Sequence, residues 1–506
     1  MLLEFDRKSL MGVPADMLAV FAAQQPGESG EARDATAAPL ADAVAAGRDL
    51  GIDLAEELSA VRFTGDLGAI ARIPTRGKAK SKLLMVVGMG PRDSIDTAAV
   101  RKAAGACARN ALKDSTLAIA IPGDLGLDQA LVAQTVTEGA GLGGYAYTRY
   151  RTKASELPSL EKISLLPGEG AEEAAVRRGV KLGEQLVRAT VLARDLVNTP
   201  PADKRPPALA QHVNDLLHDL GIKVTVMDEV DLEKGGFGGI VGVGRGSTQP
   251  PRLVELRYEP AGAKGHVVLV GRGITFDSGG LSLKTSDGMS TMKSDMAGAA
   301  AIVGAMSVLR ELSVRVNVTG LLALAENMPS GTATRVSDVL TMRGGKTVEV
   351  MNTDAEGRLV LGDALAYGVE QNPDAIINVA TLTGAQVVAL GNDIAAIMGT
   401  DEALLDEVRA AATNAGEKVW PLPLPKEYAE HLKSEVADMK NIGRPMQAGT
   451  IIGGLFLKEF VGSTPWVHMD IAGPSFTTEG DAFLNAKGGT GFGVRTLLRF
   501  LVDRSF

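Results

Sequence analysis

Cysteine is almost absent from this sequence. The chain of 506 residues contains one cysteine, Cys107, in the alanine-rich run RKAAGACARN. A disulfide within the chain and a cysteine-based metal cluster are therefore both excluded. We expect Cys107 to be a small buried helix residue. Such sparing use of cysteine is typical of a protein that works in a reducing compartment.

Histidine is scarce as well, and the five histidines do not form a metal-binding pattern. His212 and His218 lie six residues apart in a helix-like run. Two histidines that bind one metal ion from the same helix lie at i and i+4. A histidine-rich zinc site is therefore not expected, and any metal ion must be held by oxygen.

Long apolar runs and an excess of positive charge are also missing. No uninterrupted apolar run approaches the ~20 residues of a membrane span. The apolar run near the N-terminus is short and broken by Asp16, so a signal peptide is not expected. The net charge of −9 argues against a protein held to nucleic acid by its overall charge, although a local basic patch would be invisible in this total. We therefore expect a cytoplasmic protein without a membrane partner.

The length and the alternating patterns indicate at least two α/β domains. A chain of 506 residues exceeds the ~250–300 at which one core usually stops growing. Residues 83–90 and 116–123 are typical of buried strands, and residues 96–113 are typical of a helix. A longer helical pattern over residues 171–198 ends at four prolines between residues 200 and 207.

Beyond residue 205, strand-like and helix-like stretches alternate again, which is typical of a sheet with helices on both faces. We expect a smaller N-terminal α/β domain (1–170), a linker helix with a proline-rich junction (171–204), and a C-terminal α/β domain (205–506). The central sheet of the last domain should be mostly parallel and flanked by helices, with ligands beyond the carboxyl ends of its strands. Its predicted strands are 266–271, 316–325, 374–384 and 466–473, and its predicted helices are 294–312, 359–370 and 402–415.

The stretch NTDAEGRLVLGDAL carries the first group of chemically active residues. Asp354, Glu356 and Arg358 lie two residues apart, after a strand-like run and before a helix-like one. In an extended chain, such residues point to the same side. Two carboxylates that close to each other are costly unless a positive charge lies between them.

Residues 270–300 carry the second group: Arg272, Asp277, Lys284 and Asp295. Four carboxylates carry four negative charges, which two divalent ions would neutralise. Paired ions bridged by carboxylates activate water and polarise a substrate oxygen, and oxygen-rich sites suit Mn²⁺, Mg²⁺ and Zn²⁺. The acids of the two groups are called the acidic centre below; they are Asp277, Asp295, Asp354 and Glu356.

Each of these residues also has a plainer interpretation when taken alone. Asp295 could cap the following helix, and Asp277 could be an ordinary turn residue. Glu356 and Arg358 could form a surface ion pair of little value, and Lys284 could be a solvated surface lysine. The combination in one chain, rather than any single residue, favours a metal site.

A nucleophilic serine is the rival interpretation of the motif FDSGG. Ser278 would need a histidine base and an orienting acid, which could lie far away in the sequence. This hypothesis leaves most of the acidic centre and Lys284 without a role.

The two active stretches, NTDAEGRLVLGDAL and GITFDSGGLSLK with MKSDMAGAA, resemble the signatures of the leucyl (cytosol) aminopeptidase family of dinuclear metallopeptidases. The resemblance covers residues 195–502, whereas the N-terminal part matches only in its α/β character. It continues through NVATLTGA, VWPLPL, EYAEHLKSEVADMKNIG, FLKEFV, WVHMDIAGP and GTGFGVRTL.

The resemblance implies a hydrolase, a metalloprotease of the aminopeptidase class, with residues 205–506 as its catalytic domain. It would use a metal-bound hydroxide to remove N-terminal residues, with leucine and other large apolar ones favoured, from peptides that have a free N-terminus. It also implies two divalent ions (Mn²⁺ or Zn²⁺, with Mg²⁺ as a further candidate), a homohexamer and a cytoplasmic location.

Roles for single residues also follow from the resemblance. Asp277 and Glu356 would bridge the two metal ions, Asp354 would complete one metal site, and Asp295 would belong to the other.

Two cationic residues would act in catalysis. Lys284 would stabilise the developing oxyanion, and Arg358 would hold a bicarbonate-like anion that shuttles a proton. The residues that would line the substrate site are Met292, Asn352, Thr381, Leu382 and Gly384.

One position departs from the family pattern. The pattern reads Gly-Lys-Gly, and the amine of that lysine binds the second metal ion, whereas this chain has Arg272 between the two glycines. An arginine side chain stays charged and has no acceptor, so Arg272 cannot be that ligand.

Three outcomes are open for Arg272. Its side chain could swing aside and leave the ligand position to water, or it could pair with Asp295 or Asp277 and replace the second metal ion. Alternatively, the chain could be a catalytically weakened or inactive relative that acts as a structural hexamer or a DNA-binding accessory protein. We expect the first outcome, because every other catalytic position of the pattern is present.

Overall fold

The computed structural model describes residues 1–26, 35–153 and 157–505. The chain divides into two compact units, each with its own sheet: Met1–Arg188 with Glu479–Lys487, and Ala189–Thr478 with Gly488–Phe506. The predicted two-domain α/β fold is confirmed. In the described part of the chain, no helix is both long enough and apolar enough to cross a membrane.

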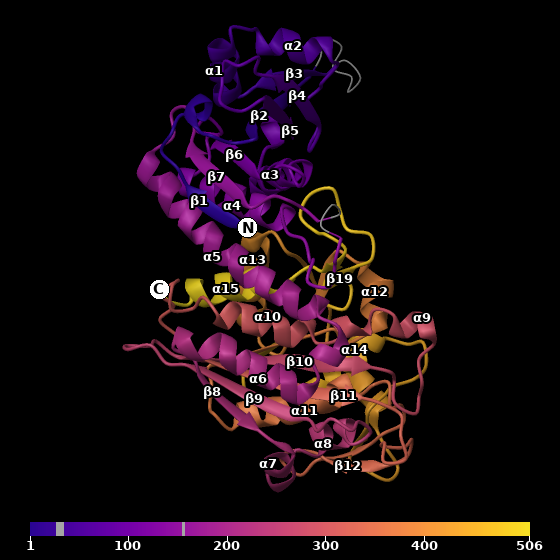
Figure 1. Ribbon diagram of the computed structural model, residues 1–506. Helices are drawn as coiled ribbons and strands as arrows, with labels where there is room; N and C mark the ends of the chain where they lie inside the picture. The colour runs from indigo at the N-terminus through magenta and orange to yellow at the C-terminus, as the bar shows by residue number, and fades with distance from the viewer. Residues whose placement is uncertain (27–34, 154–156, 506) are drawn as a thin grey trace. The chain divides into compact units, whose positions relative to one another are not determined.

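The first unit is built on a seven-stranded sheet in the order β1-β7-β6-β2-β5-β4, with β3 paired to β2 (Figure 1). Its inner strands are parallel and apolar almost throughout, as expected where helices cover both faces. Cys107 is buried in α3, as predicted. The strands are β1 (Leu2–Phe5), β2 (Met17–Gln25), β3 (Thr36–Pro39), β4 (Ile70–Pro74), β5 (Leu83–Pro91), β6 (Thr116–Ile121) and β7 (Lys162–Pro167), and the helices are α1 (Ala41–Leu50), α2 (Leu54–Ala60), α3 (Thr97–Asn110) and α4 (Gln129–Gly143). Helix α5 (Glu173–Asn198) begins in this unit, and its residues from Ala189 onward belong to the second.

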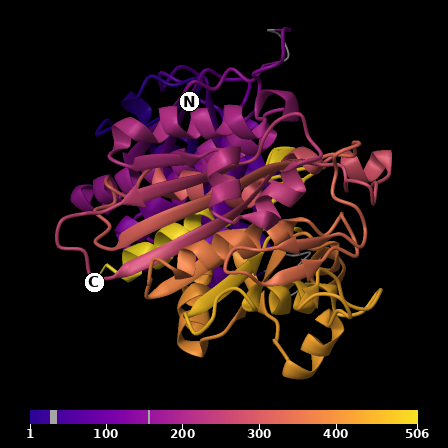
Figure 2. The same cartoon turned by 90° about the horizontal axis from the view of Figure 1, so that it is seen from below.

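The second unit has an eight-stranded sheet in the order β16-β15-β18-β14-β10-β11-β9-β8. The four central strands are mutually parallel, and antiparallel strands flank them on both sides. Figures 1 and 2 show these strands with helices on either side. The strands are β8 (Lys223–Met227), β9 (Arg252–Tyr258), β10 (His266–Asp277), β11 (Asn317–Asn327), β14 (Ala375–Ala380), β15 (Ile394–Gly399), β16 (Lys418–Pro421) and β18 (Trp466–Asp470), and the main helices are α6 (Pro206–Leu217), α8 (Gly238–Gly244), α10 (Ala297–Met306), α11 (Gly357–Val369), α12 (Gly384–Leu390), α13 (Glu402–Ala415), α14 (Gly449–Lys458) and α15 (Val494–Asp503).

Strand β10 is longer than the sequence predicted. We expected it to end at residue 271, but β11 pairs with it as far as Asp277, with a register shift between Ile274 and Phe276. Arg272 is therefore a residue of the strand and not of a loop beyond it. Because side chains alternate along a strand, Gly271 faces α10 and Arg272 faces the start of α11 on the opposite side.

The chain around Asp354 differs from the extended conformation expected there. Residues 351–356 form turns after the short strand β13 (Thr347–Glu349), and Glu356 already has helical backbone angles. Helix α11 begins at Gly357, two residues earlier than predicted, so Arg358 lies in its first turn. The acids and Arg358 are brought together by a turn and a helix start, so the prediction of an extended strand end is wrong.

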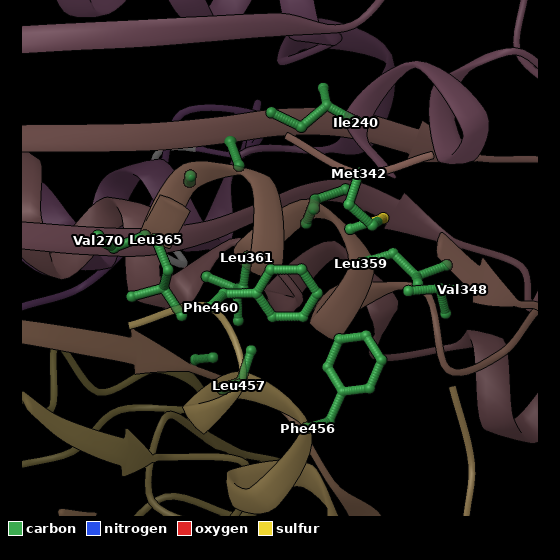
Figure 3. Packing of buried hydrophobic residues seen from close by; sticks show 14 of the residues in the cluster. Ile240, Val270, Met342, Val348, Leu359, Leu361, Leu365, Phe456, Leu457 and Phe460 are labelled. Atoms are coloured by element: carbon green, nitrogen blue, oxygen red, sulfur yellow. The ribbon is translucent and has the colours of Figure 1, made fainter. Parts of the chain in front are cut away.

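A large apolar cluster holds α11 against β10 and α14. Figure 3 shows the ring of Phe460 beside Leu361 on α11, with the ring of Phe456 next to that of Phe460. The two ring centroids lie 5.3 Å apart, in a tilted arrangement. Full burial of a single side chain of this size contributes roughly 1.5–3 kcal/mol. Because α11 contributes several such side chains to the cluster, the cluster holds this helix in place. The position of Glu356 and Arg358 follows from that packing.

His468 is a buried histidine in the centre of the second sheet. Its Nδ1 lies 2.8 Å from the amide nitrogen of Asn378, whose oxygen accepts a hydrogen bond from the indole of Trp466 at 2.8 Å. The Asn378 amide therefore donates to Nδ1, which must be unprotonated. Burial, and secondarily the charge of Arg358, lower the pKa of His468 to about 3.

We predict that His468 makes the protein less stable as the pH falls from 6.5 toward 3. The unfolded chain takes up a proton on this histidine near its ordinary pKa, and the folded chain does not, so the free energy of unfolding falls by up to about 1.4 kcal/mol per pH unit. Urea unfolding at pH 7, 6 and 5 should show a shallower decline for His468→Gln than for the wild type. The same change at the exposed His212 should leave the decline unaltered, and equal slopes for wild type and His468→Gln would refute the assignment.

Candidate metal centre

The acidic centre comes together at the carboxyl edge of the parallel strands. Asp277 ends β10, Asp295 precedes α10, and Asp354 and Glu356 lie in the turns before α11. Carboxylate oxygens of Asp277, Asp354 and Glu356 lie within 4.8 Å of one another. Of the four acids, Asp277, Asp295 and Glu356 are buried, and Asp354 is half-buried. Three oxygen ligands at this spacing can hold one hard divalent ion.

Arg272 points into this centre and does not swing aside, so the first of the three outcomes is wrong for this structure. Its Nη2 donates to Asp295 Oδ2 at 2.5 Å, also contacts Glu356 Oε1, and lies 3.9 Å from Asp277 Oδ2. Its Nη1 donates to the carbonyl of Thr381 at 2.5 Å. The physical reason is the strand alternation that directs this side chain toward α11.

Gly357 makes room for the guanidinium of Arg272. A Cβ atom at Gly357 would lie 2.5 Å from Arg272 Cζ. The guanidinium thus packs against the backbone at the start of α11, where any larger residue would collide with it. The family signature around Glu356 includes this glycine, but its spatial role becomes visible only in the fold.

Lys284 lies on the more open side of the acidic centre. Its Nζ is 2.9 Å from Asp277 Oδ2 and also contacts Asp354 Oδ1. The side chain is 18% exposed, compared with 5% for Arg272. The interpretation of Lys284 as a solvated surface lysine is therefore wrong.

The acids remain short of positive charge despite these two cations. Burial, and then the charge of Asp277, raise the pKa of Glu356 to about 8. Burial also raises the pKa of Asp295 to about 7, although Arg272 acts in the opposite direction. Burial and Asp277 raise the pKa of Asp354 as well. Further positive charge in this place would stabilise the ionised acids.

Arg358 is buried beside the centre without an acidic partner. Within the described part of the chain, no carboxylate lies in ion-pair contact with it; its Nη1 donates to the carbonyl of Asn441 at 2.8 Å, and its guanidinium lies 6.0 Å from the centroid of the Phe456 ring. Burial lowers the pKa of Arg358 to about 10, against the attraction of Glu356. The surface ion pair considered for Glu356 and Arg358 is therefore wrong.

Asp295 does not cap α10. The cap position is occupied by Met296, and the Asp295 carboxylate instead accepts from Thr381 Oγ1 at 2.8 Å and from Arg272. Asp277, by contrast, does accept a turn hydrogen bond, from the backbone of Gly279 at 2.8 Å. The turn interpretation of Asp277 and its place in the acidic centre are both correct.

Ser278 is not arranged as a nucleophile. Its buried hydroxyl donates to the carbonyl of Asn327 at 2.7 Å and accepts from the backbone of Gly280 at 3.2 Å. A catalytic serine needs a base within hydrogen-bond reach of that hydroxyl.

Two asparagines support the centre and escaped the sequence analysis. Asn327 donates to Asp277 Oδ1 at 2.8 Å and to the carbonyl of Thr353 at 3.0 Å. Asn441 donates to the carbonyl of Asn352 at 2.7 Å and accepts from the backbone of Met351 at 2.8 Å. Asn327 is the last residue of the strand that pairs with the end of β10, so its position in the sequence could have indicated a role beside Asp277. The sequence around Asn441 gives no such indication.

The five predicted substrate residues differ in how close they come to the centre. The carbonyls of Thr381 and Leu382 lie 2.5 and 3.5 Å from Arg272 Nη1. Asn352 accepts from the backbone of Asp354 at 2.8 Å. Met292 starts a short 3₁₀ helix (Met292–Ser294) before Asp295, and Gly384 is exposed at the start of α12.

An oxygen-lined centre with a neighbouring lysine, at the carboxyl edge of an α/β sheet, is typical of metal-dependent hydrolases. The model of the cytosol aminopeptidase family's catalytic domain matches residues 191–498, and the model of its N-terminal domain matches residues 20–154. The chain therefore belongs to the cytosol aminopeptidase family, which confirms the resemblance found in its motifs.

Two bacterial relatives resemble the chain over most of its length. A protein named probable cytosol aminopeptidase from Streptomyces avermitilis is 45% identical over 507 residues, which cover 96% of each chain. One of the same name from Streptomyces griseus is 46% identical over 89% of this chain and 90% of the relative.

Solved structures of two further proteins share the fold. The bottromycin maturation enzyme BotP, also solved in complex with Mn, has a TM-score of 0.84 and 37% identity, and the match in its Mn complex covers 97% of this chain and 100% of that one. A mutant of tomato leucine aminopeptidase has a TM-score of 0.85 and 32% identity over 99% of this chain and 96% of that one.

We predict that Asn327→Ala weakens metal binding by roughly 10–100-fold, because Asp277 loses the donor that orients it. Calorimetric titration of the metal-free protein with Mn²⁺ measures this loss. Asn317→Ala, at the other end of the same strand, should bind as the wild type does. An unchanged affinity in a folded Asn327→Ala protein would contradict the role given to Asn327.

Proposed function

We propose that this chain is a metal-dependent aminopeptidase that removes N-terminal residues, with leucine and other large apolar residues favoured, from peptides with a free N-terminus. Membership in the cytosol aminopeptidase family supports the aminopeptidase activity, and the family's activity depends on metal. The observation that carries the proposal is the group of three carboxylates, Asp277, Asp354 and Glu356, beside Lys284.

The residues present fit a divalent ion. The three carboxylates offer hard oxygen ligands, and the buried Oε2 of Glu356 has no hydrogen-bond partner among the described residues. Such a site suits Mn²⁺, Zn²⁺ or Mg²⁺. An ion held there would activate a water molecule and polarise the scissile carbonyl of the substrate.

Two cations would act on the substrate's charge and protons. Lys284 is anchored at the open side of the three carboxylates, where its ammonium group can stabilise negative charge on the carbonyl oxygen. Arg358 has a planar donor group with no carboxylate in contact among the described residues, so it suits a bicarbonate-like anion that passes a proton on. Met292, Asn352, Thr381, Leu382 and Gly384 would line the substrate site.

Assembly, location and domain roles are further parts of the proposal. The family resemblance supports a homohexamer in the cytoplasm, with residues 205–506 as the catalytic domain and residues 1–170 and 171–204 as N-terminal domain and linker. Among the described residues of the second unit, the four most exposed large apolar side chains are candidates for subunit contacts: Val388, Trp420, Val436 and Met446. The alternative, an inactive structural or DNA-binding relative, is not favoured by the comparisons.

The direct test is hydrolysis of leucine amide by metal-stripped protein, titrated with Mn²⁺ and separately with Zn²⁺. We expect activity to appear with metal and to disappear again with a chelator. A folded, metal-loaded protein without any hydrolysis would reject the proposed function.

We predict that Lys284→Met lowers kcat by roughly 10²–10³-fold, since it removes the cation that stabilises the oxyanion. Steady-state hydrolysis of leucine amide at saturating metal measures the effect. Lys346→Met is the matched control, because Lys346 forms an exposed ion pair with Glu459. A Lys284→Met enzyme with unchanged kcat would remove Lys284 from the catalytic machinery.

A further inference from the structure

We propose that the guanidinium of Arg272 stands in the place of a second metal ion, so that this centre holds one divalent ion between Asp277, Asp354 and Glu356. The inference rests on the proposed function, because it assigns the metal content and the internal cation of the same site. Its first support is the pairing of Arg272 with Asp295 and Glu356, which engages their oxygens with a protein cation.

The geometry separates the acidic centre into two parts. Asp277, Asp354 and Glu356 form a group whose oxygens are close enough to share an ion, and Asp295 is not part of that group. One Asp295 oxygen accepts from Thr381 at 2.8 Å, and the other accepts from Arg272 at 2.5 Å. Asp295 thus has both oxygens engaged and acts as a positioning residue for Arg272.

The charges of the centre agree with a single divalent ion. Its four carboxylates carry four negative charges when ionised, and Arg272 and Lys284 carry two positive ones. Two negative charges remain, which one divalent ion balances. A second divalent ion would leave the buried centre with two excess positive charges, and unbalanced charge in a water-poor site is costly.

Arg272 is held in place much more firmly than Lys284. Its guanidinium binds two carboxylates and the Thr381 carbonyl, and it packs against Gly357. Lys284 ends in a single ammonium on a flexible stem and is partly exposed, so it can make room for an ion while its charge stays beside Asp277 and Asp354. The position that opens for metal is therefore the one beside Lys284, and the position of Arg272 stays closed.

Direct counting of metal on the full chain tests this inference. The purified protein is saturated with Mn²⁺, freed of excess ion by gel filtration, and analysed for metal and protein content. We expect one ion per chain and a single binding phase in calorimetry. Two ions of similar affinity per chain would overturn the inference.

Two variants show whether Arg272 is what limits the metal content. Arg272→Lys removes the fixed guanidinium and supplies an amine that can lose its proton, so we expect it to take up a second ion. Asp295→Asn in the wild-type background should still hold one ion, because Asp295 is not a ligand. A folded Arg272→Lys protein limited to one ion, or an Asp295→Asn protein that binds none, would contradict the proposal.

Electron paramagnetic resonance of the Mn²⁺-loaded wild type tests directly whether the bound ions are isolated or form a pair. We expect the signal of isolated Mn²⁺ ions, whereas the signal of a coupled pair would overturn the inference. Hydrolysis of leucine amide in the same samples separates this inference from the proposed function. Activity with two ions would reject the single-ion centre alone, and inactivity with one ion would reject the aminopeptidase function alone.

Discussion

The crowding of four carboxylates at one edge of a sheet is the constraint on which the rest of this site depends. Three of the four are buried, where water screens their repulsion poorly. Neutral donors from several elements, among them Asn327, Thr381 and Gly279, each satisfy one carboxylate oxygen. Hydrogen bonds alone do not remove the charge. The raised pKa values of Asp295 and Glu356 reflect the cost of burying negative charge that remains unbalanced.

Much of this arrangement could be predicted from the sequence, because strong local patterns carry it. The parallel strands are apolar runs between turn signals, and the helices have regular patterns with clear ends, so their order and their type were predictable. Among the acids of the centre, Asp277 stands out because it ends such a strand. The antiparallel strands β9 and β15 were missed; β9 carries three charged residues among its seven, whereas β15 is an apolar run of the same length as the central strand β14.

The remaining features depend on contacts between distant segments. The extent of β10 beyond residue 271 is set by its pairing with β11, and the direction of Arg272 depends on that extension. Asn441 supports a turn that precedes it by almost ninety residues, as its separation of 89 from Asn352 shows. Gly357 makes room for a side chain from another element, and no local property of its sequence context indicates this. Sequence motifs thus pointed to the acids, Lys284 and Arg358 as candidates, whereas the contacts that each of them makes depend on packing.

The two internal cations have a consequence for how the protein matures. A centre that depended on metal for all of its positive charge would be strained until ions arrived, and folding would then be tied to metal supply. Here Arg272 and Lys284 pair with members of the acidic centre, so part of its positive charge belongs to the polypeptide itself. Because these two cations are covalently part of the chain, the charge balance of the centre depends less on metal supply than it would with carboxylates alone.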